Sequence, residues 1–517
     1  MVITVKNYWW VTRPKRKLNS IPEVLSTFAE LSLNQQWTGQ RASHLSLEDA
    51  LEKAGLKRKG ERRDQGGGGA RTYGAWLASL GLIFTQESTK QIKLTLAGEA
   101  IINGDSPVEV LKWQVLKYQF PSSFSIGRNV NVSPRFKIHP FMFLLKLLSD
   151  DRIKSLSQNE IANIIIVEAE NETDRCYEYI VKRILDYRNY GNSVLPANFN
   201  EIYGVATNST NLQDVANTMM NWLDYTQLTF RDDGRTYIVP ERAAEVAKIL
   251  AHPLPFIDRC GSHEFFQRKY GIDPKHNKDT RNLSDTKTIT AKMIAEQQII
   301  KAYIGLSLQK PITKINSAVI DYIVATTGLN EPLVIETLQR KYPKGSIGSF
   351  MTQYYEMAFK GRDEATEFEK ATVELFQDVF NYQAKHVGPI GLTPDVLVLS
   401  DADGYAGIID NKAYSKYTIS NDHHNRMVHN YIRGFNNYYN GDLPLAFFTY
   451  IAGGFGSRIN SQIKGIVDET GIHGSVINVH NMIELVQKYD PAIYTHADLR
   501  KLFTVDRQIV TADFIQQ

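Results

Sequence analysis

The chain has 517 residues, more than a single hydrophobic core usually supports, so we expect about two to four domains. Hydrophobic residues make up 43% of the sequence and charged residues 22%, a balance that excludes a disordered or fibrous protein. The formal net charge of +3 is too small to indicate a nucleic-acid partner by itself.

Cysteine usage and hydropathy narrow the class further. The two cysteines, Cys176 and Cys260, lie far apart without His or Cys neighbours at ligand spacing, which argues against a disulfide framework or a zinc site. No run of about 18 apolar residues occurs, and the N-terminal residues lack the apolar core of an export signal. We therefore expect a soluble, cytoplasmic protein.

Basic residues gather near the N-terminus. Between Glu52 and Arg63, six lysines and arginines stand against two acids, and Arg71 follows the glycine run Gly66–Gly69. The glycine run lacks the GxxxxGK[ST] pattern of a nucleotide-binding loop, so we interpret it as a flexible loop. A charge run alone usually marks a solvated surface, and it becomes a candidate site only if other features indicate a polyanion.

Three segments of the N-terminal half repeat one pattern: a helical apolar period, a turn, and two extended runs separated by a polar tip. The second opens with a capping box, Ser157 with Glu160, and the third contains the hairpin signal Asp233-Gly234. The segments span residues 73–96, 156–167 and 212–239. The pattern resembles winged helices, which lay a helix in the DNA major groove or pack against other proteins.

A change of composition follows these segments. Residues 271–290 are polar, contain proline and have few large apolar side chains, which predicts an exposed connector. Residues 291–342 return to a helical period, which predicts a helical spacer. Its apolar positions include Ile299, Tyr303, Val319, Ile323 and Ile335. We thus expect an α+β region at 1–265, the connector and spacer at 266–342, and an α/β domain at 343–517.

The C-terminal part reads as helix, strand, strand, helix, strand, helix. After an amphipathic helix at 368–380, Pro394-Asp395 leads into the apolar run 396–399, the turn 401–404 reverses the chain, and 405–409 returns to Asp410-Asn411-Lys412. A hairpin with this turn brings Asp395 beside Asp410. Paired carboxylates bind Mg²⁺ well, and Lys412 shares the face of Asp410 because strand side chains alternate.

The bare D-x-K pattern arises by chance in long chains, but its position at the ends of apolar strands favours a site. A wider set of segments occurs in order: FEKATVELFQDVFNYQAKHVG, TPD, GIIDNKAYS and AFFTYIAGGFG. Together they resemble the cleavage domain of FokI-type type IIS restriction endonucleases over roughly residues 345–517, with the motif of the PD-(D/E)xK nucleases.

The resemblance assigns roles by position. It implies that Asp395 and Asp410 bind the metal, that Lys412 is the catalytic lysine, and that Glu369 on the preceding helix supports the metal site, with Glu367 as the alternative. Asn411, where the family carries threonine, would contribute its backbone carbonyl. The implied cofactor is Mg²⁺.

The N-terminal half also resembles known enzymes. Trp10-Val11-Thr12-Arg13-Pro14 is similar to the start of FokI, and four segments are similar to the recognition half of the AlwI and BspD6I group: RTYGAWLASLGLI, KLTLAGEAI, LKYQFPS and EFFQRKYGIDP. With double-stranded DNA as the implied partner, the basic residues become candidate phosphate contacts. These are Lys57, Arg58, Lys59, Arg62, Arg63 and Arg71.

We therefore expect a prokaryotic type IIS restriction endonuclease that binds a short asymmetric site and cuts at a fixed distance, alongside a cognate DNA methyltransferase. FokI-type cleavage domains pair through an Asp and an Arg on the helix after the D-x-K strand, and the stretch NDHHNRMVHNYIRGF does not keep that pair in register. A transient homodimer therefore competes with a strand-specific nicking enzyme or the large subunit of a heterodimer. A winged-helix regulator without cleavage activity is the third alternative.

Other conspicuous residues have simpler interpretations. His423 and His424 are adjacent and would point in different directions on a helix, so we expect surface or interface roles rather than metal binding. Trp9, Trp10 and Trp113 are assigned to packing.

Overall fold

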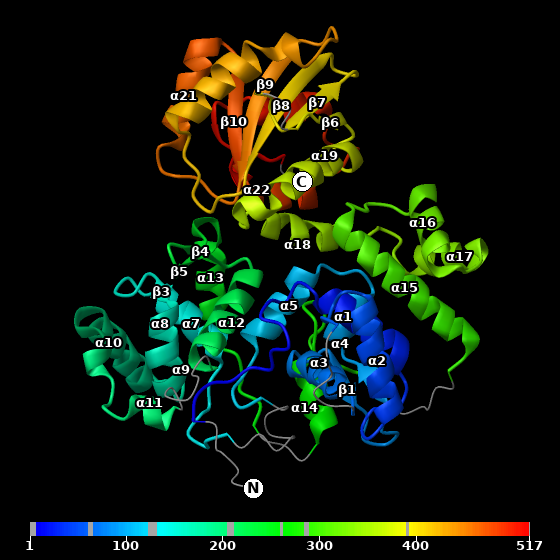
Figure 1. Cartoon of the computed structure of the whole chain (residues 1–517), viewed down its shortest axis with the longest axis vertical. Helices are drawn as coiled ribbons and strands as arrows, with labels where there is room; N and C mark the ends of the chain where they lie inside the picture. The colour runs from blue at the N-terminus through cyan, green and yellow to red at the C-terminus, as the bar shows by residue number, and fades with distance from the viewer. Residues whose placement is uncertain are drawn as a thin grey trace. The chain divides into compact units, whose positions relative to one another are not determined.

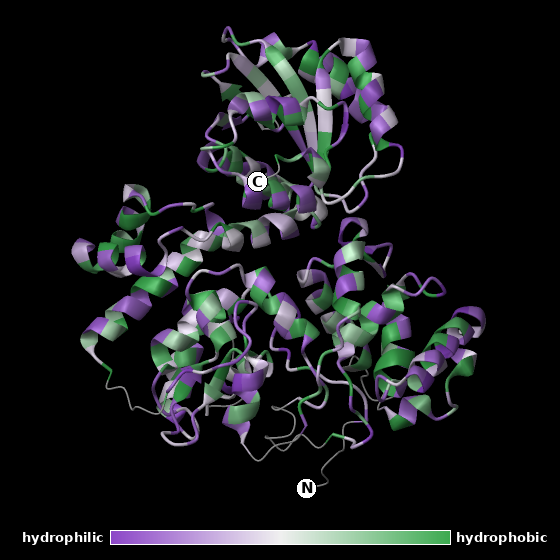
Figure 2. Ribbon diagram, turned by 180° about the vertical axis from the view of Figure 1, so that it is seen from behind, coloured by the Kyte–Doolittle hydropathy of each residue, from purple (hydrophilic) through white to green (hydrophobic). Residues whose placement is uncertain are grey.

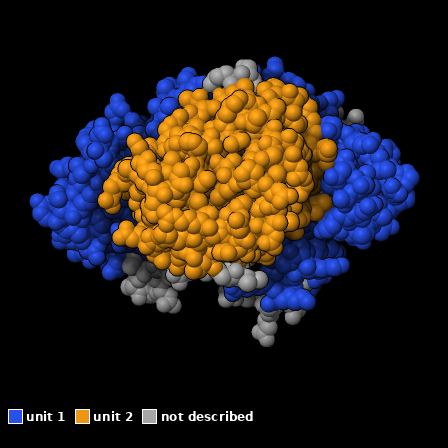
Figure 3. Space-filling model, turned by 90° about the horizontal axis from the view of Figure 1, so that it is seen from above, with its two compact units in different colours: residues 1–305, 315–343 blue, residues 306–314, 344–517 orange. Residues whose placement is uncertain are grey.

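The computed structural model describes residues 7–59, 66–122, 132–203, 211–258, 262–283, 289–388 and 392–515. The chain forms two compact units, distinguished by colour in Figure 3. Unit 1 comprises Met1–Gly305 and Ile315–Pro343, and unit 2 comprises Leu306–Lys314 and Lys344–Gln517. Within the described residues, no helix is both long and apolar enough to span a bilayer.

Unit 1 is mainly helical (Figure 1). Its described helices are α1 (Ile21–Ser32), α2 (Arg41–Lys53), α3 (Gly68–Ser79), α4 (Leu96–Ile102), α5 (Pro107–Leu116), α7 (Pro140–Leu148), α8 (Gln158–Glu160), α9 (Ile166–Glu168), α10 (Asp174–Tyr190), α11 (Phe199–Ile202), α12 (Asn211–Tyr225), α13 (Ala243–Leu250), α14 (His263–Tyr270), α16 (Ser317–Thr327) and α17 (Glu331–Lys341), while α15 (Ala291–Gln309) runs from unit 1 into unit 2. Hydrophobic and hydrophilic residues alternate along many helices, as expected where one face packs on a core (Figure 2).

The first predicted segment forms a helix and a hairpin. Helix α3 is followed by β1 (Ile83–Thr85) and β2 (Ile92–Leu94), which pair antiparallel. The helix begins earlier than predicted, because Gly67 adopts a positive φ of 79° and Gly68 opens the first turn. A Cβ on Gly69 would lie 2.6 Å from Oε1 of Glu48. The glycine run therefore opens a packed helix, which corrects the expectation of a flexible loop.

The second and third predicted segments share one sheet. The described strands β3 (Leu156–Ser157), β4 (Thr229–Asp232) and β5 (Arg235–Ile238) lie in the order β3-β5-β4. The Ser157 capping box and the hairpin at Asp233-Gly234 both form as predicted. Glu160 joins the two segments by an ion pair to Arg235 (2.9 Å), and it also pairs with Arg188 of α10 (2.7 Å). The described part of this region thus has two small sheets, one for each hairpin, and the second segment has no hairpin of its own.

Most described residues of the predicted connector are exposed, including 274–278, but two of its positions are held by contacts. In the described part of the stretch 271–290, the carboxylate of Asp279 is only 2% exposed and pairs with Arg268 (2.9 Å) and Arg281 (2.8 Å). The carbonyl of Gly271 accepts the N–H of Ala97 at 2.8 Å. Asp279 and Gly271 therefore anchor an otherwise exposed connector to the rest of unit 1. The spacer is helical as predicted, and Tyr303 of α15 stacks on Tyr342 at 3.9 Å.

The described residues of unit 2 form a six-stranded mixed sheet in the order β11-β10-β9-β8-β7-β6. Its strands are β6 (Gln383–His386), β7 (Val396–Ser400), β8 (Tyr405–Lys412), β9 (Leu445–Ala452), β10 (His473–Asn478) and β11 (Arg507–Gln508), and its helices include α18 (Ile347–Met357), α19 (Ala365–Asp378), α20 (Asn421–Asn425), α21 (Ile459–Thr470), α22 (Val479–Lys488) and α23 (His496–Phe503). Strands β6, β7 and β8 pair antiparallel, whereas β8 to β11 pair parallel.

Helices cover both faces of this sheet (Figure 1). Val396 and Val398 of β7 join a core with α18, α19, α22 and α23, whereas Leu397 and Leu399 join the opposite core with α21. This alternation is the period-two pattern of a strand buried on both faces. Polar groups at the ends of β7 and β8 are thereby fixed on a rigid support.

Candidate active site

Two predicted acids meet at one end of the β7-β8 hairpin. Asp395 directly precedes β7, and Asp410 lies near the end of β8. Because Val396 pairs with Ile409, the register brings Asp395 beside Asp410, as the turn predicted. The pKa of Asp395 also responds to the Asp410 carboxylate, which is the electrostatic signature of close carboxylates.

Asp395 is held by the neighbouring strand. Its Oδ2 accepts the backbone N–H of Asn411 at 2.6 Å. Burial, followed by the charge of Asp410, raises the pKa of Asp395 well above its usual value, while Lys412 opposes the shift. Two close carboxylates in a buried site therefore favour a cation or a proton between them.

Asp410 and Lys412 form a buried ion pair. The Nζ of Lys412 lies 2.5 Å from Oδ2 of Asp410, and the lysine side chain is 15% exposed. Burial lowers the pKa of Lys412, but Asp410 and Asp395 together raise it further, so the net shift is upward. The lysine is therefore a cation at neutral pH.

Glu369 lies near these groups on helix α19. Its Oε2 accepts a 2.7 Å hydrogen bond from His386 Nε2 of β6, and its charge contributes to raising the pKa values of Asp395 and Lys412. Glu367, by contrast, is 59% exposed and pairs with Lys370. The geometry thus brings Glu369, rather than Glu367, into the electrostatic field of the acids.

One carboxylate oxygen of Asp410 is suited to binding a divalent cation. Oδ1 of Asp410 is buried and has no hydrogen-bond partner, so an oxygen beside Asp395 is available to a hard ion. Among the described residues, no three His, Cys, Asp or Glu side chains converge as a ready-made metal cluster. Mg²⁺ needs only one or two protein carboxylates and retains its waters, so this geometry is compatible with it.

Sequence reasoning missed two contacts. Asn411 was assigned only a backbone carbonyl, but its N–H supports Asp395 and its Nδ2 donates to Thr372 Oγ1 at 2.7 Å. His386 was not singled out, although it pairs with Val396, next to Asp395, in the β6-β7 register. The sequence signal for His386 is that it ends the strand that pairs with the Pro-Asp strand.

The predicted phosphate contacts differ in environment. Lys57 is 21% exposed, and its ammonium pairs with Glu48 (2.9 Å) and Glu52 (2.5 Å). Arg58, Lys59 and Arg71 are exposed, whereas Arg62 and Arg63 lie outside the described residues. Lys57 therefore stabilises the packing of its own segment, and its charge is already balanced.

The remaining conspicuous residues have mainly structural contacts. His423 Nδ1 bonds Tyr417 at 2.8 Å, and His424 pairs with Glu469 at 3.0 Å, so the two histidines point to different partners. Trp9 is fully buried, and Trp10 and Trp113 pack against the same core. Cys260 lies outside the described residues.

Comparison with known proteins identifies the family. The model of the AlwI restriction endonucleases matches residues 78–344, just over half of the chain. The chain belongs to the AlwI restriction endonuclease family. Residues 328–510 match the model of the FokI cleavage domain, which covers Asp395, Asp410 and Lys412. This AlwI-family member is a DNA-binding nuclease, a type IIS restriction endonuclease of the FokI and AlwI type.

Solved structures give looser similarities. FokI restriction endonuclease, alone and bound to DNA, matches over 98% of this chain and 100% of the FokI chain, with 14% identity and a TM-score of 0.28. The BpuJ1 endonuclease binding domain, in complex with pyrene- and phenanthrene-modified DNA, matches over 52% of this chain and 98% of its own, with 14% identity and a TM-score of 0.36. No curated protein matches. The family assignment therefore rests on the two sequence families.

Proposed function

We propose that this endonuclease binds a short asymmetric site in double-stranded DNA and hydrolyses phosphodiester bonds at a fixed distance from it, using Mg²⁺. The observation that carries the proposal is the convergence of Asp395, Asp410 and Lys412 at one end of a buried hairpin, with an unpartnered oxygen on Asp410. Glu369 completes the proposed site from α19.

Each side chain has a task in this reaction. Asp395, oriented by the N–H of Asn411, and Asp410 would hold the cation, supported by Glu369. A bound Mg²⁺ would supply charge neutralisation and Lewis-acid polarisation of the phosphate. Lys412, cationic because its pKa is raised, would donate hydrogen bonds to the phosphate oxygens as negative charge grows on them. Water adds to phosphorus, one phosphodiester P–O bond breaks, and the leaving oxygen takes a proton.

The domain roles follow the same proposal. Residues 1–265 would read DNA through winged-helix-like modules, 266–342 would act as connector and spacer, and 343–517 would form the PD-(D/E)xK cleavage domain. Support comes from the helix-and-hairpin segments of unit 1 and from the central β7-β8 hairpin of unit 2. The proposed partners are a cognate DNA methyltransferase and a second copy of the cleavage domain.

Incubation of plasmid DNA with Mg²⁺ tests the centre. Asp395→Ala and Lys412→Ala proteins should lose cutting by about a thousandfold or more. Asp403→Asn, an exposed change in the turn of the same hairpin, is the matched control and should cut normally. Full cutting by either centre variant would overturn the proposed site. Run-off sequencing of the wild-type products then gives the site and the cut offset.

A strand-specific nicking activity is the second candidate. Helix α20 lies where FokI-type domains are expected to pair, and it spans only Asn421–Asn425 before a π-helix continues from Arg426 to Ile432. Its exposed Asp422 and Arg426 pair with each other at 2.9 Å. Both charges are therefore satisfied within one copy. Supercoiled plasmid converted only to open circles, even at high enzyme concentration, would support nicking.

A further inference from the structure

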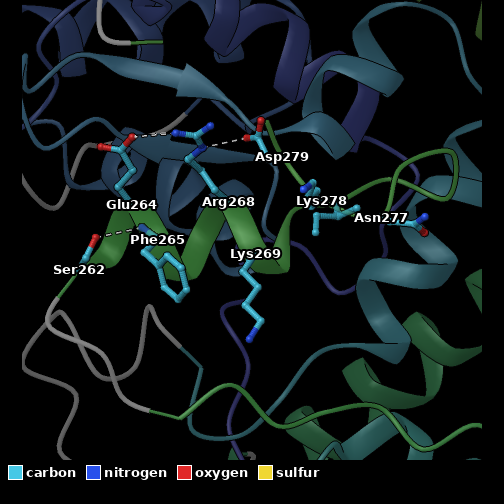
Figure 4. A pocket seen from close by; sticks show the side chains of 9 residues that line it. Ser262, Glu264, Phe265, Arg268, Lys269, Asn277, Lys278 and Asp279 are labelled. Atoms are coloured by element: carbon cyan, nitrogen blue, oxygen red, sulfur yellow. Dashed lines mark hydrogen bonds and ion pairs between the residues drawn. The ribbon is translucent and has the colours of Figure 1, made fainter. Parts of the chain in front are cut away.

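An open hollow lies on unit 1 beside helix α14. Its volume is about 580 Å³, and its wall is formed by α14 and the following loop (Figure 4). We call it the α14 hollow and define it by Phe265, Arg268, Lys269, Asn277, Lys278 and Asp279. None of these residues belongs to the proposed cleavage centre or to the predicted phosphate contacts.

The inner face of α14 is fixed to the core. Phe266 is 3% exposed, Gln267 donates to the carbonyls of Ala78 (2.6 Å) and Ile83 (3.2 Å), and Tyr270 is 4% exposed. Ser262 caps the helix by accepting the N–H of Phe265 at 3.0 Å. The outer face is therefore displayed on a rigid support and cannot turn inward to hide its side chains.

An aromatic ring stands on that outer face. Phe265 is 57% exposed, which is unusual for phenylalanine, a residue that normally contributes to a core. It lies one turn before Lys269, and the two side chains extend from the same side of α14 into open space (Figure 4). In duplex DNA the base faces are already stacked, but an exposed ring beside a cation can make apolar contact with a thymine methyl group while the cation attracts a phosphate.

The free charge of the hollow is positive. Its acid Asp279 and the neighbouring Glu264 are both paired with Arg268, at 2.9 Å and 3.4 Å, and Asp279 also pairs with Arg281. Lys269 and Lys278, in contrast, are exposed and form no ion pair with any described residue. The arginine neutralises the acids, and the two lysines are left to attract an anion.

We propose that the α14 hollow is a DNA-contacting site of unit 1, in which Lys269 and Lys278 bind backbone phosphates and Phe265 packs against a neighbouring nucleotide. This inference rests on the proposed function, because duplex DNA is the polyanion that this enzyme must hold. The exposed amide of Asn277 adds a donor and an acceptor at the rim.

Binding measured across a salt series tests the lysines. The probe is a short duplex carrying the recognised site found by run-off sequencing, in metal-free buffer so that no cutting occurs. For Lys269→Ala/Lys278→Ala, we expect Kd to rise about tenfold and the slope of log Kd against log salt to fall by about 2, because two phosphate contacts are lost. The matched control is Lys182→Ala/Lys248→Ala, which removes two exposed lysines from α10 and α13. Equal losses of DNA affinity in the two double variants would mean that Lys269 and Lys278 contribute only general positive charge, and this result would overturn the proposed site.

The aromatic contact is tested separately. Phe265→Ala should raise Kd about tenfold with little change in salt slope, and Phe265→Trp should restore binding. Tyr190→Ala, which removes a 66% exposed ring from α10, is the control. Lysine methylation footprinting of the wild-type protein needs no variant: duplex DNA should protect Lys269 and Lys278. Full reactivity of both lysines in the complex would contradict the proposal.

The two proposals fail in different ways. Variants of the hollow leave Asp395 and Lys412 intact, so their cutting of plasmid should fall only in step with their weaker DNA binding. If the wild-type protein neither binds nor cuts DNA, the proposed function fails. If the wild-type protein binds and cuts DNA and the variants bind normally, only the proposal for the α14 hollow is wrong.

Discussion

The backbone N–H of Asn411 donates a 2.6 Å hydrogen bond to Oδ2 of Asp395, which ties the first acid of the site to the strand that carries the second. The same residue anchors its side chain on Thr372 of α19. Sheet and helix therefore jointly fix the position of the acids. Such rigidity keeps close carboxylates in place although their charges repel each other.

That repulsion predicts a stability effect. Metal-free Asp395→Asn protein should be more stable than the wild type at neutral pH by about 1 kcal/mol, because it removes a buried carboxylate from beside Asp410. Since the folded state raises the pKa of Asp395 above its usual 3.8, the protonated form stabilises the fold at low pH, and this contribution disappears as the pH rises through the raised pKa. The Tm difference should therefore grow as the pH rises from the usual pKa of 3.8 through the raised pKa of Asp395.

Thermal unfolding in EDTA measures this difference. Asp403→Asn, in the exposed hairpin turn, should show no comparable trend. A variant that is less stable than the wild type at every pH would contradict the electrostatic account.

The choice between two glutamates gives a second prediction. Glu369→Gln should lower single-turnover cleavage about tenfold to a hundredfold and raise the Mg²⁺ concentration needed for half-maximal rate, because Glu369 accepts a hydrogen bond from His386 and its charge acts on Asp395. Glu367→Gln should change neither quantity, since Glu367 is 59% exposed and pairs only with Lys370. The reverse ranking would assign the metal support to Glu367.

Helix α20 gives a third prediction, on the number of strands cut. If two copies pair through this helix, Asp422→Arg should lower the yield of linear plasmid about tenfold while nicking persists, because like charges would face each other. The double variant Asp422→Arg/Arg426→Asp should restore linear product. Unchanged ratios of linear to open-circle DNA in both variants would mean that the two copies do not pair through this helix.

A fourth prediction concerns Glu160, a buried carboxylate of unit 1. Glu160→Gln should lower the free energy of unfolding by about 3 kcal/mol, because Arg188 and Arg235 would both lose their carboxylate partner. Urea unfolding, monitored by tryptophan fluorescence, measures this loss of free energy. Glu178→Gln, an exposed partner of Arg152, is the control and should leave the free energy of unfolding almost unchanged. Similar losses in both variants would mean that burial of Glu160 contributes little.

The sequence predicted the elements whose signals are local. The turn 401–404, the alternation of apolar residues and the hairpin at Asp233-Gly234 each arise from a few consecutive residues, and all three form as expected. Because a two-strand register follows from the turn, the approach of Asp395 to Asp410 could also be predicted.

Only the tertiary structure decided the partners of the polar groups. The pairing of β3 with β5 and the two arginines around Glu160 involve residues tens of positions apart. The donation from Asn411 to Asp395 and the hydrogen bond between Glu369 and His386 likewise depend on how a strand meets its neighbours. Periodicity fixes which face of an element is buried, but a buried charge takes whichever partner the folded chain brings within hydrogen-bonding distance, and that choice is made by the packing of the whole unit.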